Sequence, residues 1–244
     1  MSPRRTLATT ARVLRQLARD HRTLGLVLLV PPLLIVLLRY VFDAQPRVFD
    51  SVALMMLGIF PLIMMFLVTS IATLRERTSG TLDRLMAGPI SKLDFIFGYA
   101  IAFSIVGLVQ ASLACFVTLG LLGVSVAGSA TAVIVTAICA SFLGTSLGLF
   151  VSAFARNEFQ AVQLVMPIIM PQVLVCGLFI ARAQMASVLQ TISDYFPITY
   201  SVDAMRQVLT HDTWTSDLTH DLLIVLGCGV LALLLSALTI RRQE

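Results

Sequence analysis

The sequence predicts an all-α, polytopic membrane protein with six transmembrane helices. Its 244 residues are 58% hydrophobic and only 12% charged, whereas a soluble domain carries about 25% charged residues. Four stretches without any charged residue are long enough to cross a bilayer, which takes about 20 apolar residues. They cover 51–74, 95–155, 159–181 and 222–240. The dyad alternation of an outer-membrane barrel is missing, so a helical bundle is the predicted fold class.

The apolar stretches divide into spans in chain order. A first stretch, 23–38, continues past Arg39 to Phe42, and its long basic flank and lack of a small-residue cleavage site argue against a cleavable signal peptide. The 61-residue stretch 95–155 can hold two spans, with a break in the small-residue segment 119–131. We therefore expect one membrane domain, 1–244. Its six spans are predicted at 24–42, 52–73, 96–120, 132–154, 160–181 and 221–240.

The arginines and the single lysine predict the orientation of the bundle. With both termini on one side, that side receives 13 of the 17 basic residues. Because cytoplasmic loops carry the excess of basic residues, both termini are expected in the cytoplasm. The net charge of +4 then reflects topology, and no nucleic-acid partner is expected. The four cysteines lie inside predicted spans without a CxxC pair, so no metal site or disulfide is expected.

Residues 1–22 are expected to form a cytoplasmic amphipathic helix in the lipid headgroup layer. Apolar residues recur at helical spacing on one side and arginines on another. The apolar set is Leu7, Ala8, Ala11, Leu14, Leu17 and Ala18, and the basic set is Arg12, Arg15, Arg19 and Arg22. A plain basic tail that only sets the topology is the alternative.

A dense polar segment, 75–94, interrupts the apolar chain between the second and third spans. Residues 75–78 are expected to extend the second span, and Gly80 is expected to let the chain turn. A short cytoplasmic helix follows, with Leu82 and Leu85 on its apolar edge, until a Gly-Pro pair ends it. Such a helix suits docking into a groove of a soluble partner. A solvated loop is the alternative.

The segment 182–220, between the fifth and sixth spans, is moderately polar. It predicts two short amphipathic outer helices, 185–196 and 199–209, the first of them ended by Pro197. Both are too short to cross a bilayer. We expect them to dip into the outer leaflet or to lie on it.

Two stretches resemble segments of ABC-2 type transporter permeases. RERTSGTLDRLMAGPISKLDFIFG is similar to the segment after that family's second span. Its matching positions are Glu76, Gly80, Thr81, Leu82, Leu85, Pro89, Ile90, Ser91 and Gly98. VLQTISDYFPITYSVDAMRQVL resembles the stretch between the family's last two spans, with matches at Pro197, Thr199, Tyr200, Ala204, Met205 and Arg206. Two departures are Thr78, where an acidic residue is common, and Ala186, which follows Met185 in place of a proline.

The resemblance implies a membrane subunit of a bacterial ABC exporter, located in the inner (plasma) membrane. In that family the polar segment contains a coupling helix that meets a separate ATPase subunit, and two permease subunits, identical or different, assemble with two ATPases. Contact with the ATPase is expected at Glu76, Arg77, Gly80, Thr81, Leu82 and Leu85. The sequence has no G-x-x-x-x-G-K-[ST] motif, so the chain is not expected to be an enzyme or to bind a cofactor. ATP and Mg would belong to the partner.

Methionines of the second and fifth spans predict a substrate cleft. Methionine is flexible and polarizable and suits promiscuous apolar surfaces, and these spans border the central cleft in similar transporters. The cleft set is Met56, Phe60, Met64, Met166 and Met170. The cargo is expected to be hydrophobic or amphiphilic: a drug, an antibiotic or a lipid-like compound. Methionines that face lipid or pack between helices are the alternative.

Pro197, Tyr200 and Arg206 are expected to belong to an outer cap over the cleft. Arg206 would pair with Asp203 or Asp194 and hold the outer helices in place, and an exposed pair of little energetic value is the alternative. Membrane lipid is a further expected partner. Two other functions remain open: export of a polysaccharide or glycoconjugate, and a non-transporting scaffold that regulates an ATPase. An ion-driven carrier is disfavoured because the spans carry essentially no ionisable groups.

Overall fold

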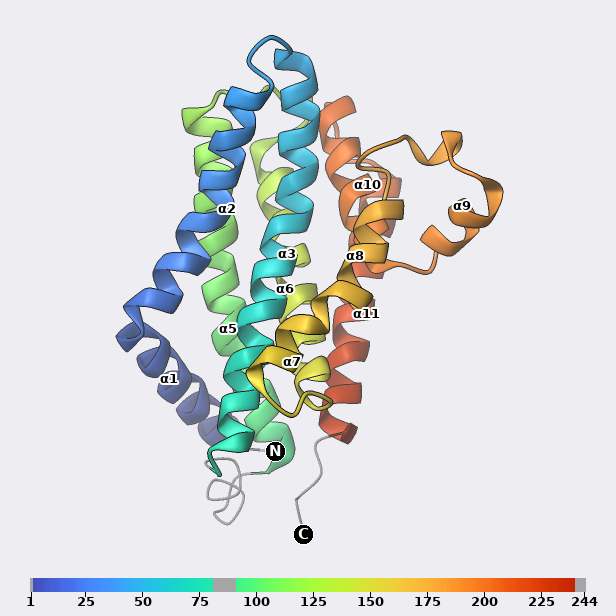
Figure 1. Ribbon diagram of the computed structural model, residues 1–244. Coiled ribbons are helices and arrows are strands. Elements are labelled where there is room, and N and C mark those ends of the chain that lie inside the picture. The colour runs from blue at the N-terminus through green and yellow to red at the C-terminus, as the bar shows by residue number, and fades with distance from the viewer. Residues whose placement is uncertain (1, 81–90, 240–244) are drawn as a thin grey trace.

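The computed structural model describes residues 2–80 and 91–239, and within them it confirms the predicted fold class. The described residues form helices and no strand. Six segments are long and apolar enough to cross a membrane. They are α2 (His21–Val41), α3 (Pro46–Thr78), α5 with the π-helical turn η1 (Lys92–Leu121), α6 (Ala130–Ser152), α7 with α8 (Glu158–Val175) and α11 (Ser216–Thr239). Helix α1 (Pro3–Arg19) precedes them, and α1, the last turns of α3 and α11 and the first turn of α5 lie at one end of the bundle (Figure 1).

Two segments depart from the predicted bounds. Helix α3 has 33 residues and begins at Pro46, well before the predicted span, because proline is favoured in the first turn of a helix. The fifth segment divides into α7 (Glu158–Gln163) and α8 (Val165–Val175), and Pro167 in the first turn of α8 has no N–H for a continuous helix. Helix α8 ends six residues before the predicted 181, and Gly177 follows with a φ of 92° that an α-helix cannot use.

Helices α3 and α6 form the centre of the bundle because glycines let their backbones approach closely. Gly144 and Gly148 of α6 face α3, in the small-xxx-small spacing typical of membrane helix contacts. A Cβ atom on Gly144 would overlap the carbonyl oxygen of Leu62, and one on Gly148 would lie 2.6 Å from the carbonyl oxygen of Phe66. The core around this contact includes Leu57, Leu62, Phe66 and Leu143, all fully buried.

Helix α10 (Pro197–Thr210) packs into this core, next to α3 and α11 (Figure 1). Its buried side chains include Ile198, Val202 and Met205, and the Ser201 hydroxyl donates a 2.9 Å hydrogen bond to the carbonyl oxygen of Gly58. Pro197 begins α10 and does not end the preceding helix, α9 (Ser187–Ser193), so that expectation was wrong. Among the described elements, α9 and the 3-10 turn η2 (Arg182–Gln184) extend away from the bundle (Figure 1).

We predict that Gly144→Ala destabilises the bundle. The added methyl group would overlap α3 backbone, which cannot rotate away as a side chain can, so α3 and α6 must separate. Overpacking of this kind costs about 1–3 kcal/mol. The measurement is the thermal unfolding temperature of the purified protein in detergent. Gly227→Ala is the matched control, because a Cβ atom at Gly227 meets no atom within 4 Å. Equal unfolding temperatures for the two variants would refute the proposed importance of this contact.

Candidate functional site

Helix α1 contacts the two segments that flank residues 81–90, the end of α3 and the start of α5. Helix α3 ends at Thr78 and α5 begins at Lys92, at the end of the bundle that α1 crosses (Figure 1). Helix α1 leaves the axis of α2 at Asp20, whose carboxylate accepts hydrogen bonds from the backbone N–H and the hydroxyl of Thr23. Because these hydrogen bonds stabilise the ionised carboxylate, they lower the pKa of Asp20. The turn at Asp20 directs α1 across α3 and α5.

The contact downstream of residues 81–90 centres on Asp94, which is 1% exposed. One carboxylate oxygen accepts hydrogen bonds from the Ser2 backbone N–H (2.8 Å) and the Thr6 hydroxyl (3.2 Å). The other accepts from the Ser91 hydroxyl (2.8 Å) and the Ser91 backbone N–H (3.2 Å), while the Ser91 side chain accepts from the Asp94 N–H. Ser91 and Asp94 form a capping box for α5. The Asp94 side chain thus takes part in the N-terminal cap of α5 and also binds the start of α1.

The contact upstream of residues 81–90 consists of Arg12, Glu76 and Tyr99. Glu76 is 5% exposed, and its Oε1 atom lies 3.1 Å from Nη1 of Arg12. Nη2 of Arg12 donates a 3.0 Å hydrogen bond to the Tyr99 hydroxyl. Breaking a buried pair leaves an uncompensated charge, so this contact fixes α1 to the end of α3. Glu76 is one of the residues predicted to contact the ATPase, and in this structure its carboxylate is buried and pairs with Arg12.

The face of α1 that packs on α5 is a threonine face. Thr6, Thr9 and Thr10 are buried, and the Thr10 hydroxyl donates a 3.1 Å hydrogen bond to the carbonyl oxygen of Gly98. A Cβ atom on Gly98 would lie 2.7 Å from Cβ of Thr9, so only glycine allows this approach. The sequence analysis placed Leu7 and Leu17 together on an apolar face, with the arginines on another. In the structure Leu7 is 62% exposed, whereas Leu17 is buried.

Arg77 and Gly80 are two other predicted contact residues. Arg77 lies in the last turn of α3, and Gly80 follows the end of that helix. The guanidinium of Arg77 donates a hydrogen bond to the backbone oxygen of Ser152 at the end of α6. Gly80 has a φ of 69°, in agreement with the expected turn. The neighbouring Arg75 forms a bidentate ion pair with Glu158 of α7, with Nε 2.6 Å from Oε1. Thr81, Leu82 and Leu85, the remaining predicted contact residues, lie outside the described residues.

Within the part of the chain that the structure describes, the five predicted cleft residues lie in different surroundings. Met56 is buried in the core, at 8% exposed, and Phe60 packs against that core. Met64 lines a cavity that α3 forms with α1 and α2. Met166 and Met170 of α8 are 66% and 36% exposed.

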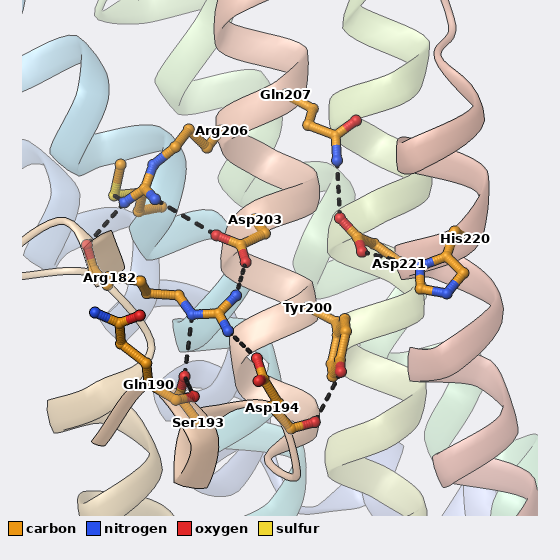
Figure 2. A network of polar contacts seen from close by, with 12 residues as sticks. Arg182, Gln190, Ser193, Asp194, Tyr200, Asp203, Arg206, Gln207, His220 and Asp221 are labelled. Atoms are coloured by element: carbon orange, nitrogen blue, oxygen red, sulfur yellow. Dashed lines mark hydrogen bonds and ion pairs between the residues drawn. The ribbon is translucent and has the colours of Figure 1, made fainter. Parts of the chain in front are cut away.

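Beside α10, two arginines and two aspartates form a network (Figure 2). Arg182 pairs with Asp194 and, at 2.8 Å, with Asp203, and it donates a 3.0 Å hydrogen bond to the Ser193 hydroxyl. Arg206 lies 3.4 Å from the other oxygen of Asp203 and donates a 2.8 Å hydrogen bond to the carbonyl oxygen of Gly177. Asp203 thus joins the segments on both sides of α9. The predicted pairing of Arg206 is present, with Asp203 as its partner.

Arg182 is the member of this network that the sequence analysis missed. Partial burial alone would lower the pKa of Arg182, but the hydrogen bond and charge of Asp203, together with the charge of Asp194, outweigh it and raise that pKa. The other two predicted cap residues lie close by. The Tyr200 hydroxyl donates a 2.7 Å hydrogen bond to the backbone oxygen of Asp194, and Pro197 occupies the first turn of α10. Two arginines among several aspartates between 182 and 212 were the available signal.

We predict that Asp94→Asn loosens the first turns of α1. The amide nitrogen of asparagine is a donor and would face donors that now bind a carboxylate oxygen. The measurement is hydrogen–deuterium exchange of peptides within residues 2–12, which is expected to become faster. Asp217→Asn, at an exposed site in the first turn of α11, is the control. Unchanged exchange in the Asp94 variant would show that the other contacts of α1 suffice to hold it.

We predict that Arg182→Ala releases the segment around α9. Loss of this guanidinium leaves Asp194 and Asp203 without their shared partner, whereas Arg206 still holds Asp203 and Gly177. Limited proteolysis is expected to cut residues 181–196 faster, with the remainder of the bundle unaffected. Arg47→Ala, at an exposed position, serves as the control. Cleavage at the wild-type rate would mean that Arg182 does not restrain α9.

Comparisons with known proteins agree with the resemblance found in the sequence. The profile of a family described as "ABC-2 type transporter" matches residues 4–210. ABC transporter G family member 20 of Dictyostelium discoideum is 26% identical over 58% of this chain and 20% of its own length. In Escherichia coli, probable multidrug ABC transporter permease YbhR is 27% identical over 60% of this chain and 40% of its own.

A second Escherichia coli protein, inner membrane transport permease YhhJ, is 28% identical over 58% of this chain and 38% of its own length. The chain thus spans less than half the length of these relatives.

Proposed function

The chain belongs to the ABC-2 type transporter family, and on this premise we propose that it is the permease subunit of an ATP-driven exporter in a bacterial inner membrane. Both termini would face the cytoplasm, together with α1 and the end of the bundle that carries most basic residues. The observation that carries the proposal is the attachment of α1 to both sides of residues 81–90, through Glu76 and Asp94.

The energy for transport would come from a separate ATPase subunit. The sequence contains no phosphate-binding G-x-x-x-x-G-K-[ST] motif, and its single lysine, Lys92, lies in the first turn of α5. ATP and Mg would therefore be bound by the partner. The described spans carry few ionisable side chains, and Arg75, Glu76 and Asp94 form their ion pairs and hydrogen bonds at helix ends. This supports an external energy source over an ion gradient.

The predicted coupling segment, 75–94, would be the ATPase contact, with Thr81, Leu82 and Leu85 in the partner's groove. Arg77 and Gly80 would fix where the segment leaves α3, and Glu76 would act as a positioning residue through Arg12. A push on this segment would move α1, α3 and α5 together, because buried or partly buried hydrogen bonds connect all three helices. Rigid helices can then carry the displacement along the bundle.

A second permease subunit, identical or related, would complete the substrate path. Exposed Met166 and Met170 suit such a shared surface, and methionine tolerates varied apolar ligands. The cargo would be a hydrophobic or amphiphilic compound, such as a drug, an antibiotic or a lipid-like molecule. Two of the Escherichia coli relatives carry the name "multidrug", which agrees with this cargo class. Polysaccharide or glycoconjugate export, and a non-transporting scaffold, are the other candidates.

We predict that Leu82→Asp abolishes ATPase binding while the protein still inserts into the membrane. A charge would enter the apolar edge that is expected to fill the partner's groove. The measurement is a mild-detergent pull-down of the tagged protein from its native membranes, with ATPase activity assayed in the eluate. Thr213→Asp adds the same charge at an exposed site next to α11 and should retain the ATPase.

Retention of a cargo-stimulated ATPase by the Leu82→Asp variant would contradict the assigned contact. An ATPase bound to the wild type that hydrolyses ATP independently of cargo, with no transport in vesicles, would favour the scaffold.

A further inference from the structure

We propose that a groove between α5, α6 and α11 holds an acyl chain of a phospholipid from the cytoplasmic leaflet. The groove has a volume of about 530 Å³, within the range of about 300–1,000 Å³ typical of small-molecule sites. Described residues of one chain form it. The inference goes beyond the proposed export function, because it needs the membrane but neither an ATPase nor a second subunit.

The groove has a buried floor and an exposed rim. Its buried lining residues include Ala100 of α5, Cys139 of α6 and Leu233 of α11. At the rim, Ile105 of α5 is 43% exposed and Val230 of α11 is 49% exposed. Because these helices cross the membrane, the rim opens to the hydrocarbon of the bilayer.

Small residues create this hollow. On α5, Ala100 and Ser104 face the groove with little side-chain volume. On α11, Gly229 lets the Phe142 ring of α6 lie close to the backbone, since a Cβ atom on Gly229 would lie 2.7 Å from that ring. Phe142 also lines the groove. The hollow thus results from how the three helices pack.

The position of the groove along the helices matches one leaflet. On α5 its lining extends from Phe97 to Leu108, which is about 17 Å of helix at about 1.5 Å per residue. One leaflet contributes about half of the roughly 30 Å of hydrocarbon. Phe97 lies near the start of α5 at Lys92, at the end of the bundle that is proposed to face the cytoplasm. An acyl chain of the cytoplasmic leaflet can therefore lie along the whole groove.

The composition and the width of the groove favour an acyl chain over other occupants. None of the described residues that line it is charged, so the polar end of an amphiphilic cargo would find no charged partner there. Helices α5 and α11 contact each other, and the axes of contacting helices lie about 8–10 Å apart. A further helix is about 10–12 Å wide. A helix of a second copy therefore cannot enter between them, whereas a single alkyl chain can.

Close contact, rather than the hydrophobic effect, would hold the chain. Lipid tails are as apolar as the lining side chains, so entering the groove removes no apolar surface from water. An unfilled gap loses the dispersion contacts of its lining, and a chain along the groove restores them. The rim residues Ile101, Ile105 and Val230 have stiff β-branched side chains. The bound chain would therefore exchange more slowly than the lipid around the rest of the bundle.

The test uses phosphatidylethanolamine with a photoactivatable diazirine in one acyl chain, as a minor component of phosphatidylethanolamine–phosphatidylglycerol nanodiscs that hold one copy of the full-length chain. Peptide mapping is expected to find several-fold more label at 97–108 and 226–234 than on α2. Lipid that only surrounds the protein would favour α2, whose Leu29 and Leu33 are 62% and 63% exposed. Labelling in proportion to exposure would overturn the proposal. Because no ATPase is present, a failed exporter assignment would leave this result unchanged.

A matched pair of variants on α5 tests the groove itself. Ser104→Phe fills it without adding a charge and should lower the labelling of α5 and α11 to the level of α2. Val109→Phe adds a ring of the same size at an exposed position outside the lining and should label as the wild type does. Ile101→Trp, at the exposed rim, takes the place of Ser104→Phe if that variant does not fold.

Native mass spectrometry after delipidation gives a second readout. The wild type and Val109→Phe should retain a single phospholipid that the groove variant loses. Retention and labelling at the wild-type level in the groove variant would exclude the site. Loss of labelling in nanodiscs that hold two copies would assign the groove to a second copy of the chain and would also overturn the proposal.

Discussion

The buried carboxylate of Asp94 is the interaction on which this end of the molecule depends. It accepts hydrogen bonds from Ser2, Thr6 and Ser91, so the first turn of α1 and the start of α5 share one hydrogen-bond acceptor. Glu76 closes the same arrangement from the end of α3 through Arg12. Because unpaired polar groups are costly away from water, these contacts hold their partners in one geometry. Three helices thereby meet where the chain enters and leaves the predicted coupling segment.

The rest of the bundle provides a stiff frame behind this junction. Membrane helices gain no hydrophobic driving force from burying one another, so close packing and small residues must hold them. Gly144 and Gly148 bring α6 against the backbone of α3, and Gly98 does the same for α1 and α5. The cavity at the turn of Asp20 exists because α1 is pulled toward α5 by its threonine face, away from α2. Tight contacts on one side of α1 thus leave space on the other.

Sequence patterns predicted the six apolar segments because charge-free length is a direct consequence of the bilayer. They could not predict the buried role of Glu76, since a charged residue beside an apolar span has the same sequence appearance whether solvated or paired with Arg12. Thr6, Thr9 and Thr10 were overlooked because amphipathic analysis follows apolar residues, while this packing face is polar. The break at Leu164 and the role of Arg182 depend on contacts distant in sequence. The Gly144-xxx-Gly148 spacing was visible and could have been used.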